Sequence, residues 1–243
     1  MTAATSDKKT NTEISEIFSS VQGEGFYLGA RQIFVRFGRC NMHCVYCDEL
    51  EKMQSGAFSK MSSDFIVSQI KQLDQECGPH HSVSFTGGEP LMYPDAFAGL
   101  LKRVKQLGFK TYLETNATYP ETLQKVLSDL DILSIDLKPE SSSGDRSFWN
   151  QHRDFLKIAS AKEGYVKVVV TAGTTDEDIR KCLELVAQEA PQYRVVLQPV
   201  SGASGPDQAV LQRLENNRRT LCRAGGQTPY WVIPQMHKIW KVR

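Results

Sequence analysis

The sequence predicts an α/β protein built around a mostly parallel sheet. Short apolar runs alternate along the chain with segments whose apolar residues recur at helical spacing. Repeated strand–helix units of this kind place consecutive strands parallel in one sheet. The chain has 243 residues, of which 40% are hydrophobic and 23% charged. One domain with a sizeable core is therefore expected.

Seven runs rich in β-branched and aromatic residues are predicted as strands. They lie at 33–37, 82–85, 110–114, 132–136, 166–170, 194–198 and 230–233. A helical segment follows each of the first six, which gives six strand–helix units and a final strand. An earlier run at 13–18 is predicted as an additional strand at the edge of the sheet.

Three helices are predicted from apolar residues that share one face. Their apolar faces lie within 66–77, 97–107 and 179–186. Gly108 is expected to end the second helix, and Thr174 or Thr175 to begin the third. Cys77 and Cys182 fall on apolar faces, where a free cysteine packs as a small hydrophobe.

The remaining segments predict a single domain with one flexible end. Residues 1–12 are polar and are predicted as a flexible tail, residues 13–243 as one domain, and 139–147 as a loop within it. Lys and Arg number 29 and Asp and Glu 28, so no nucleic-acid partner is expected. Because the chain has neither an apolar leader nor a run near the ~20 residues that span a bilayer, we expect no membrane contact and a cytoplasmic location.

Polar residues cluster where the predicted strands end. In parallel strand–helix folds the carboxyl ends of the strands share one rim, and ligands bind there. The clusters are TGGEP at 86–90, ETN at 114–116, DLK at 136–138, QPVS at 198–201 and PQMHK at 234–238. We therefore expect these segments to form one site.

Cys40, Cys44 and Cys47 lie within eight residues, directly after a predicted strand. A short loop can curl so that three thiolates face one metal site. The spacing fits zinc with a fourth ligand such as His43, or an iron–sulfur cluster with one iron free of protein ligands. A redox pair of Cys44 and Cys47 is a third interpretation. A disulfide framework is not expected in a long chain with few cysteines.

The cysteine spacing Cys-x3-Cys-x2-Cys, with Tyr46 before the last cysteine and TGGEP after the next strand, resembles the radical S-adenosylmethionine (SAM) superfamily. The resemblance implies a partial, open (βα)6-type barrel. It also implies that the three cysteines hold a [4Fe–4S] cluster whose open iron is chelated by SAM. Reductive cleavage of SAM then yields a 5′-deoxyadenosyl radical. Gly87 and Gly88 suit close approach of a ligand to the backbone, Glu89 can pair with the methionine ammonium, and Tyr46 suits stacking near adenine.

Further segments resemble the 7-carboxy-7-deazaguanine synthase family: EIFSSVQGEG at 16–25, the Arg of FVRF at 34–37, ETN, and MHKIWKVR at 236–243. The resemblance implies a lyase that converts 6-carboxy-5,6,7,8-tetrahydropterin to 7-carboxy-7-deazaguanine with loss of ammonia, in queuosine and deazapurine biosynthesis. It implies SAM and Mg²⁺ as cofactors, a homodimer, and an electron donor of the flavodoxin or ferredoxin type.

The resemblance also implies roles for individual residues. The substrate-binding residues would be Val21, Gln22, Gly23, Glu24, Arg36, Thr86, His237 and Arg243. The SAM-binding residues would be Tyr46, Gly88, Glu89, Glu114, Asn116, Asp136, Lys138, Gln198 and Ser201. Arg36 suits a substrate carboxylate because its guanidinium can bind both oxygens at once, although a surface salt bridge is the alternative.

Two positions depart from the family pattern. Asp136 stands where the family has Ser, and Glu49 stands where it usually has the Thr or Ser that binds Mg²⁺. We expect Glu49 to bind Mg²⁺, because hard oxygen ligands suit this ion. Alternatively, Glu49 replaces the ion by accepting a hydrogen bond from the substrate or by pairing with a cation such as Lys138, or it is a solvated loop carboxylate.

Two other functions compete with this lyase. A radical SAM activating enzyme has the same cysteine spacing but acts on a partner protein, and the VQGEG and C-terminal HK segments weigh against it. A zinc-stabilised, non-catalytic binding protein has no need of the polar strand ends that form the predicted rim.

Overall fold

The computed structural model describes residues 11–202, 204–224 and 228–242, in which the long strands form one nine-stranded sheet. The strand order is β11-β8-β7-β6-β5-β4-β2-β1-β3. The parallel strands are β2 (Arg31–Phe37), β4 (Ser82–Gly87), β5 (Thr111–Thr115), β6 (Ile132–Leu137), β7 (Glu163–Val170), β8 (Val195–Pro199) and β11 (Tyr230–Val232). Each of the seven strands predicted from the sequence is present.

Within the described residues the sheet does not close, because β11 and β3 each pair with one neighbour. β1 (Asn11–Val21) runs antiparallel to β2, and β3 (Ser59–Ser62) runs antiparallel to β1. The predicted mostly parallel, open α/β architecture is confirmed. The prediction that 13–18 forms an edge strand is wrong, since β1 has a neighbour on each side and β3 forms the edge.

Two further boundaries differ from the predictions. Asn11 and Thr12 belong to β1 rather than to a tail, because they pair with Ser62 and Met61 of β3, and Thr12 is buried. The loop predicted at 139–147 contains the short helix α5 (Glu140–Ser143). Gly144, at φ +70°, ends this helix in the left-handed conformation that favours glycine.

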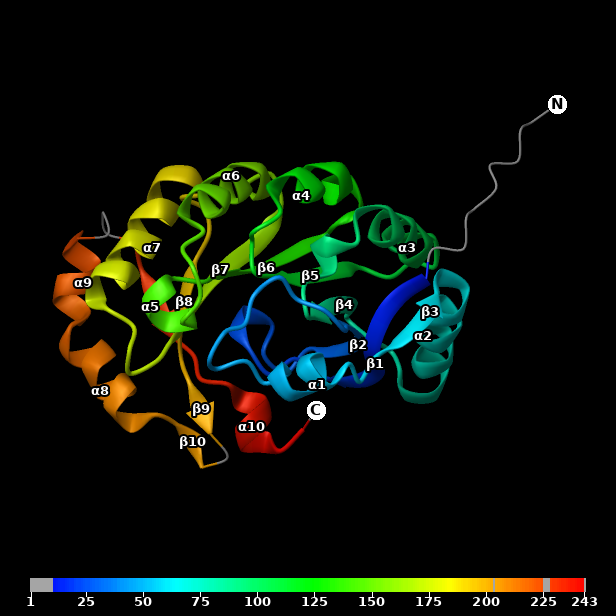
Figure 1. Ribbon diagram of the computed structural model, residues 1–243, viewed down its shortest axis with the longest axis horizontal. Helices are drawn as coiled ribbons and strands as arrows, with labels where there is room; N and C mark the ends of the chain where they lie inside the picture. Colours follow the sequence, from blue (N-terminus) through cyan, green and yellow to red (C-terminus); the bar gives the residue numbers. More distant parts are fainter. Residues whose placement is uncertain (1–10, 203, 225–227, 243) are drawn as a thin grey trace.

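Helices form an arc around the outer face of the sheet (Figure 1). They are α2 (Ser63–Cys77), α3 (Pro94–Gln106), α4 (Pro120–Val126), α6 (Trp149–Ala159), α7 (Asp176–Glu189), α8 (Gln208–Asn216) and α9 (Arg218–Ala224). Thr175 caps α7 by accepting a hydrogen bond from the Asp178 amide, as the sequence predicted for one of two threonines. Gly108 follows α3 at φ +86°.

The main hydrophobic core lies between this arc and the sheet. Its buried side chains include Phe85 and Leu113 from the strands, and Phe97, Leu156 and Cys182 from the helices. Burial of these apolar side chains supplies most of the favourable free energy of folding. The core thereby holds the strand ends rigidly at the rim where ligands are expected.

The inner face of the sheet is covered by shorter segments (Figure 1). They comprise the cysteine loop at 38–49, the helices α1 (Leu50–Ser55) and α10 (Met236–Trp240), and the 3-10 turn Gly25–Tyr27. The two-stranded sheet of β9 (Ser201–Gly202) and β10 (Gly205–Pro206) lies beside α10 (Figure 1). Further 3-10 turns lie at Pro90–Met92 and Leu127–Asp129. In the part of the chain that the structure describes, no helix has the length and apolar character needed to cross a membrane.

Candidate active site

A cavity of about 580 Å³ opens on the inner face of the sheet, at the carboxyl ends of the parallel strands. Segments from the whole chain line it: β1 and the turn that follows, the cysteine loop, the strand ends and α10. Among the predicted residues, those lining it are Val21, Gln22, Gly23, Glu24, Arg36, Cys40, Cys44, Tyr46, Cys47, Glu49, Thr86, Gly88, Glu114, Asn116, Asp136, Lys138, Gln198 and His237. Glu89 and Ser201 are not in the lining, and Arg243 lies outside the described residues.

The three cysteines of the loop face this one cavity as free thiols. The loop is held by a hydrogen bond from the Val45 amide to the Ser143 carbonyl (2.9 Å) and by one from Asn116 Nδ2 to Cys40 Sγ (3.6 Å). His43, the fourth ligand in the zinc interpretation, is exposed and does not line the cavity. No three His, Cys, Asp or Glu side chains of the described residues are arranged to hold a single metal ion.

The thiols are held in their neutral form by their surroundings. Burial raises the pKa of Cys40 to about 12, and it raises the pKa values of Cys44 and Cys47 above their usual range, although Lys138 acts in the opposite direction. The buried side chains of Met42 and Phe148 pack around the loop. Because metal binding removes the thiol protons, this water-poor environment suits a metal cluster better than free thiolates.

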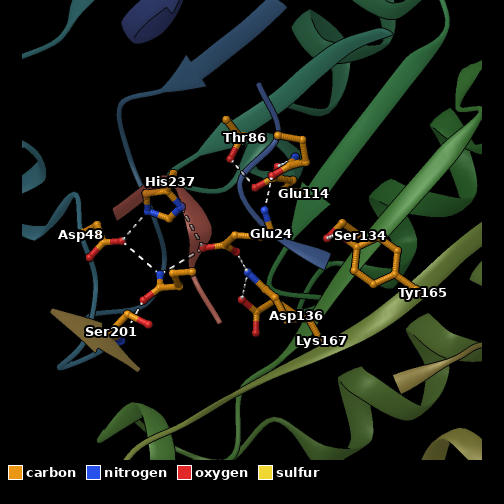
Figure 2. Close-up of polar contacts among 12 residues, drawn as sticks. Glu24, Asp48, Thr86, Glu114, Ser134, Asp136, Tyr165, Lys167, Ser201 and His237 are labelled. Atoms are coloured by element: carbon orange, nitrogen blue, oxygen red, sulfur yellow. Dashed lines mark hydrogen bonds and ion pairs between the residues drawn. The ribbon is translucent and has the colours of Figure 1, made fainter. Parts of the chain in front are cut away.

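Gln22, Thr86 and Glu114 form one hydrogen-bonded group on the wall of the cavity. Gln22 Nε2 donates to Glu114 Oε1 (2.8 Å), and Thr86 Oγ1 donates to Glu114 Oε2 (2.8 Å), as Figure 2 shows for the second pair. β4 and β5 place Thr86 and Glu114 side by side because parallel neighbours end at the same rim. The group offers a carboxylate, an amide and a hydroxyl to the edge of a polar heterocycle.

A second group alternates acids and lysines across the cavity, and Figure 2 shows its members Glu24, Lys167 and Asp136. Lys167 Nζ donates a hydrogen bond to Glu24 and lies 3.2 Å from Asp136 Oδ2, which also accepts from Lys138 Nζ (2.8 Å). Burial disfavours the charged form of Glu24, but Lys167 and His237 hold the pKa of Glu24 well below its usual range. The group contains two carboxylates and two ammonium groups, and each carboxylate lies beside at least one ammonium.

Several buried polar atoms beside this group have no hydrogen-bond partner among the described residues. They are Asp136 Oδ1, the Tyr46 hydroxyl, and both Oε1 and Nε2 of Gln198, whose side chain is fully buried. A buried polar atom without a partner is costly, so such atoms around one cavity indicate a polar ligand. Lys138 Nζ also lies 5.0 Å from the centre of the Tyr46 ring, in a cation–π contact.

The helix α10 closes one side of the cavity. Lys238 Nζ lies 2.7 Å from Asp48 Oδ1 and also donates to the Ser201 carbonyl (2.7 Å), while His237 Nε2 lies 3.7 Å from Asp48 Oδ2. Gly23 allows His237 to pack closely against the turn after β1, since a Cβ on Gly23 would lie 2.5 Å from the Cβ of His237. Ser201 therefore anchors α10 from outside the cavity instead of facing a ligand.

The glycines of the TGGEP segment line the cavity, whereas Glu89 lies outside the lining. A Cβ on Gly88 would lie 1.8 Å from the Arg39 carbonyl oxygen, and a Cβ on Gly87 2.4 Å from Arg36 Cγ. The absence of a side chain at both glycines thus allows the chain to pack closely against itself at the edge of the cavity. Glu89 is fully buried, and its carboxylate accepts hydrogen bonds from the amides of Leu91 and Asn116 and from Thr115 Oγ1. It holds the strand ends in place beneath the cavity.

Arg36 and Glu49 contact each other, which the sequence did not predict. Arg36 Nη1 lies 3.2 Å from Glu49 Oε1, and Arg36 Nε lies 2.9 Å from Glu16 Oε1. Glu49 Oε2 lies 3.2 Å from Lys52 Nζ. The cations beside Glu49 are therefore Arg36 and Lys52, whereas Lys138 pairs with Asp136.

Several polar lining residues were not among the predicted site residues, and they include Glu16, Asp48, Lys52, Lys167 and Gln235. Lys167 had a usable signal, since it interrupts the apolar run VKVVV, and a lysine is rarely buried without a partner. Asp48 lies inside the cysteine motif, and Gln235 inside a predicted strand-end cluster. Lys52 lies in a helix that is largely exposed, and we find no signal for it.

Comparison with known proteins finds relatives that match nearly the whole chain. Residues 34–186 match the family model of the radical SAM superfamily. A 7-carboxy-7-deazaguanine synthase from Geobacter sulfurreducens is 32% identical over 246 residues, which cover 95% of this chain and 97% of the relative. Another from Methanothermobacter thermautotrophicus is 33% identical over 250 residues, which cover 95% of this chain and 97% of the relative.

Solved structures share the fold. The crystal structure of QueE from Escherichia coli superimposes with a TM-score of 0.63 at 21% identity, covering 93% of this chain and 95% of that chain. Streptococcus suis SuiB, in a crystal structure bound to S-adenosylmethionine, gives a TM-score of 0.56 at 18% identity, covering 81% of this chain and 48% of that chain. At these identities the likeness concerns the fold alone.

Proposed function

The chain belongs to the 7-carboxy-7-deazaguanine synthase family of the radical SAM superfamily, and from this premise we propose which residues of its cavity carry out the family's reaction. Membership makes it a radical SAM enzyme with a [4Fe–4S] cluster and SAM as cofactors. The reaction is the conversion of 6-carboxy-5,6,7,8-tetrahydropterin to 7-carboxy-7-deazaguanine with loss of ammonia. The observation that carries the assignment is the single cavity that joins the three thiols to the polar residues of the strand ends.

Cys40, Cys44 and Cys47 would hold the cluster, which when bound supplies the electron that cleaves SAM. Asn116 positions Cys40 through its side-chain amide, and Glu89 positions Asn116 through the backbone. The unpartnered atoms of Asp136 and Gln198, together with Tyr46, provide polar and aromatic contacts for SAM next to the thiols.

The substrate would bind on the side of the cavity formed by the VQGEG segment and α10. A pterin edge carries alternating N–H and C=O groups. The carboxylates of Glu24 and Glu114 accept from such N–H groups, while the Gln22 amide holds the Glu114 carboxylate in place by a hydrogen bond. Arg36 lies on the same wall, where its guanidinium can neutralise a substrate carboxylate. The contacts of His237 and Lys238 with Asp48 hold α10 against this side of the cavity.

The setting of the enzyme is also part of the proposal. We propose a homodimer that receives electrons from a flavodoxin- or ferredoxin-type donor in the cytoplasm. The cysteines described as free include all three of the loop, and unpaired thiols persist in a reducing compartment. Neither nucleic acid nor a membrane is part of the proposed reaction.

The test is an anaerobic assay of the reconstituted protein. We expect iron and sulfide to match one [4Fe–4S] cluster, and 6-carboxytetrahydropterin with SAM and a reductant to yield 7-carboxy-7-deazaguanine. Replacing Gln22 or Glu24 should abolish product while leaving the cluster spectrum intact. A protein with an intact cluster that cleaves SAM but forms no deazapurine from this pterin would refute the proposed substrate.

A further inference from the structure

Four charged side chains form a compact group at one side of the cavity: Glu16, Arg36, Glu49 and Lys52, here called the four-charge group. All four line the cavity, and acids alternate with cations. Lys52 Nζ lies 3.2 Å from Glu16 Oε1 and 3.2 Å from Glu49 Oε2, while Arg36 lies 2.9 Å from Glu16 and 3.2 Å from Glu49. Each acid therefore contacts both cations.

The four-charge group is built from segments that other contacts hold in place. Glu16 and Arg36 are partners across the β1–β2 ladder, so the sheet fixes their separation. Glu49 directly precedes α1, and one helical turn brings Lys52 back beside it. The side chains of Glu16, Arg36 and Glu49 are 16–22% exposed, so solvent screens their contacts only in part.

Glu49 occupies the position where the family resemblance implies a small hydroxyl ligand of Mg²⁺. A divalent ion bound there would need a free carboxylate oxygen. In this chain each oxygen of Glu49 already faces a cation, Oε1 facing Arg36 and Oε2 facing Lys52. No further acid among the described residues joins Glu49 in a metal-binding group. The residues at this position thus do not fit Mg²⁺.

We propose that the Lys52 ammonium occupies the cation position beside Glu49, so that this enzyme binds and turns over its substrate without Mg²⁺. An ammonium is a compact charge with three donors, and it can neutralise oxygens that would otherwise face a divalent ion. Lys52 and Arg36 both line the cavity, so their positive charges face the space that a ligand would occupy. The inference rests on the proposed function for the identity of that ligand.

The test combines direct metal binding with turnover in the anaerobically reconstituted holoenzyme, using chelator-treated reagents. Mn²⁺, a paramagnetic stand-in for Mg²⁺, is titrated by electron paramagnetic resonance with SAM and the pterin present. We expect the wild type to bind no stoichiometric Mn²⁺, and Mg²⁺ to change its turnover by less than about twofold. In Lys52→Ala, Glu49 loses a partner and its Oε2 is freed, so this variant should bind one Mn²⁺ and become dependent on Mg²⁺.

Two further variants test whether Mn²⁺ binding depends on the Glu49 carboxylate and on the position of the lysine that is removed. Glu49→Thr leaves Arg36 and Lys52 without their shared acid, and it should bind no Mn²⁺ because two cations face the position. Lys157→Ala is the matched control, since Lys157 forms a similar pair three residues from Asp154 on an exposed helix face. It should behave as the wild type.

One stoichiometric Mn²⁺ in the wild type, displaced by Mg²⁺, with turnover that chelation abolishes and Mg²⁺ restores, would overturn the inference. So would a Lys52→Ala variant that neither binds Mn²⁺ nor responds to Mg²⁺. If no preparation converts the pterin, the proposed function fails, while Mn²⁺ titration with SAM alone still decides whether a divalent ion binds beside Glu49.

Discussion

Replacing Lys167 with Met tests whether one buried lysine balances the acids of the cavity. Lys167 is 8% exposed and contacts both Glu24 and Asp136. At the 3.2 Å that separates it from Asp136, a pair of unit charges attracts by about 5 kcal/mol at an effective dielectric constant of about 20. Desolvation offsets much of this attraction. Removing one partner of such a pair costs about 3–5 kcal/mol, because the other charge stays buried and unpaired.

The expected result is a large loss of stability. For a chain of this size each kcal/mol lowers the midpoint of thermal unfolding by about 2–4 °C, so Lys167→Met should lower it by roughly 6–20 °C. The measurement is thermal unfolding of the holoenzyme by intrinsic fluorescence under anaerobic conditions. Lys157→Met, which removes an exposed lysine with a single weak ion pair, is the control and should shift the midpoint little.

The pH dependence of the defect has a definite sign. The folded-state pKa of Glu24 lies below its ordinary value of 4.5, so ionised Glu24 stabilises the fold above that pH, and the contribution is lost as the pH falls. Without Lys167 the pKa of Glu24 rises, and protonation relieves the unpaired charge at a higher pH. The difference between Lys167→Met and wild type should therefore shrink as the pH falls from about 7.5 to about 5.

A second variant distinguishes lost charge balance from lost packing. Glu24→Gln combined with Lys167→Met removes both charges of the pair, and it should recover part of the lost stability. A Lys167→Met protein whose midpoint matches the wild type at neutral pH would refute the reasoning. A double variant less stable than Lys167→Met would refute it as well.

Three other predictions concern the cysteine loop and α10. Changing Cys40, Cys44 or Cys47 to Ala should remove the iron–sulfur absorbance and SAM cleavage, and an intact cluster in any of these variants would contradict the assignment. Cys182→Ala is the control and should keep both, because Cys182 is a buried thiol away from the cavity. Gly23→Ala should displace α10, because its Cβ would lie 2.5 Å from the Cβ of His237, and it should raise the KM for the pterin with little change in SAM binding. Gly99→Ala, where a Cβ meets nothing within 4 Å, is the control, and an unchanged KM in Gly23→Ala would count against the proposal. Asp48→Asn should weaken the contacts with His237 and Lys238, so that more SAM is cleaved without formation of the deazapurine. The measurement is the ratio of 5′-deoxyadenosine to deazapurine, and a ratio equal to that of the wild type would show that these contacts do not close the site.

The order of strands and helices could be predicted from the sequence because it depends on local periodicity. Apolar runs such as VKVVV and the helical spacing of Ile179, Cys182, Leu183 and Val186 are set by neighbouring residues, and the structure contains the corresponding elements β7 and α7. The shared rim of polar strand ends could also be predicted from the sequence, because the carboxyl ends of parallel strands lie at one edge of the sheet. Thr86, Glu114, Asp136 and Gln198 do line one cavity.

The partners within that cavity depend on the tertiary structure. Glu24 meets Lys167 across 143 positions of sequence, and Gln235 meets Glu24 across 211, distances over which no periodic pattern links two residues. Glu89 follows the two glycines of a ligand-binding motif, yet its carboxylate is bound by three groups of the protein beneath the cavity. A motif identifies a residue type, whereas the direction of its side chain depends on which neighbours satisfy it.

Glu49 shows most clearly what each level determines. The sequence by itself determined that a carboxylate stands two positions after the last cysteine of the loop, and that a metal ion or a protein cation could satisfy it. Only the tertiary structure decided which cations lie there, because the β1–β2 ladder brings Arg36 beside Glu16 and the first turn of α1 returns Lys52 toward both acids. Charges interact through space, and their separation is set by the fold that the local patterns build.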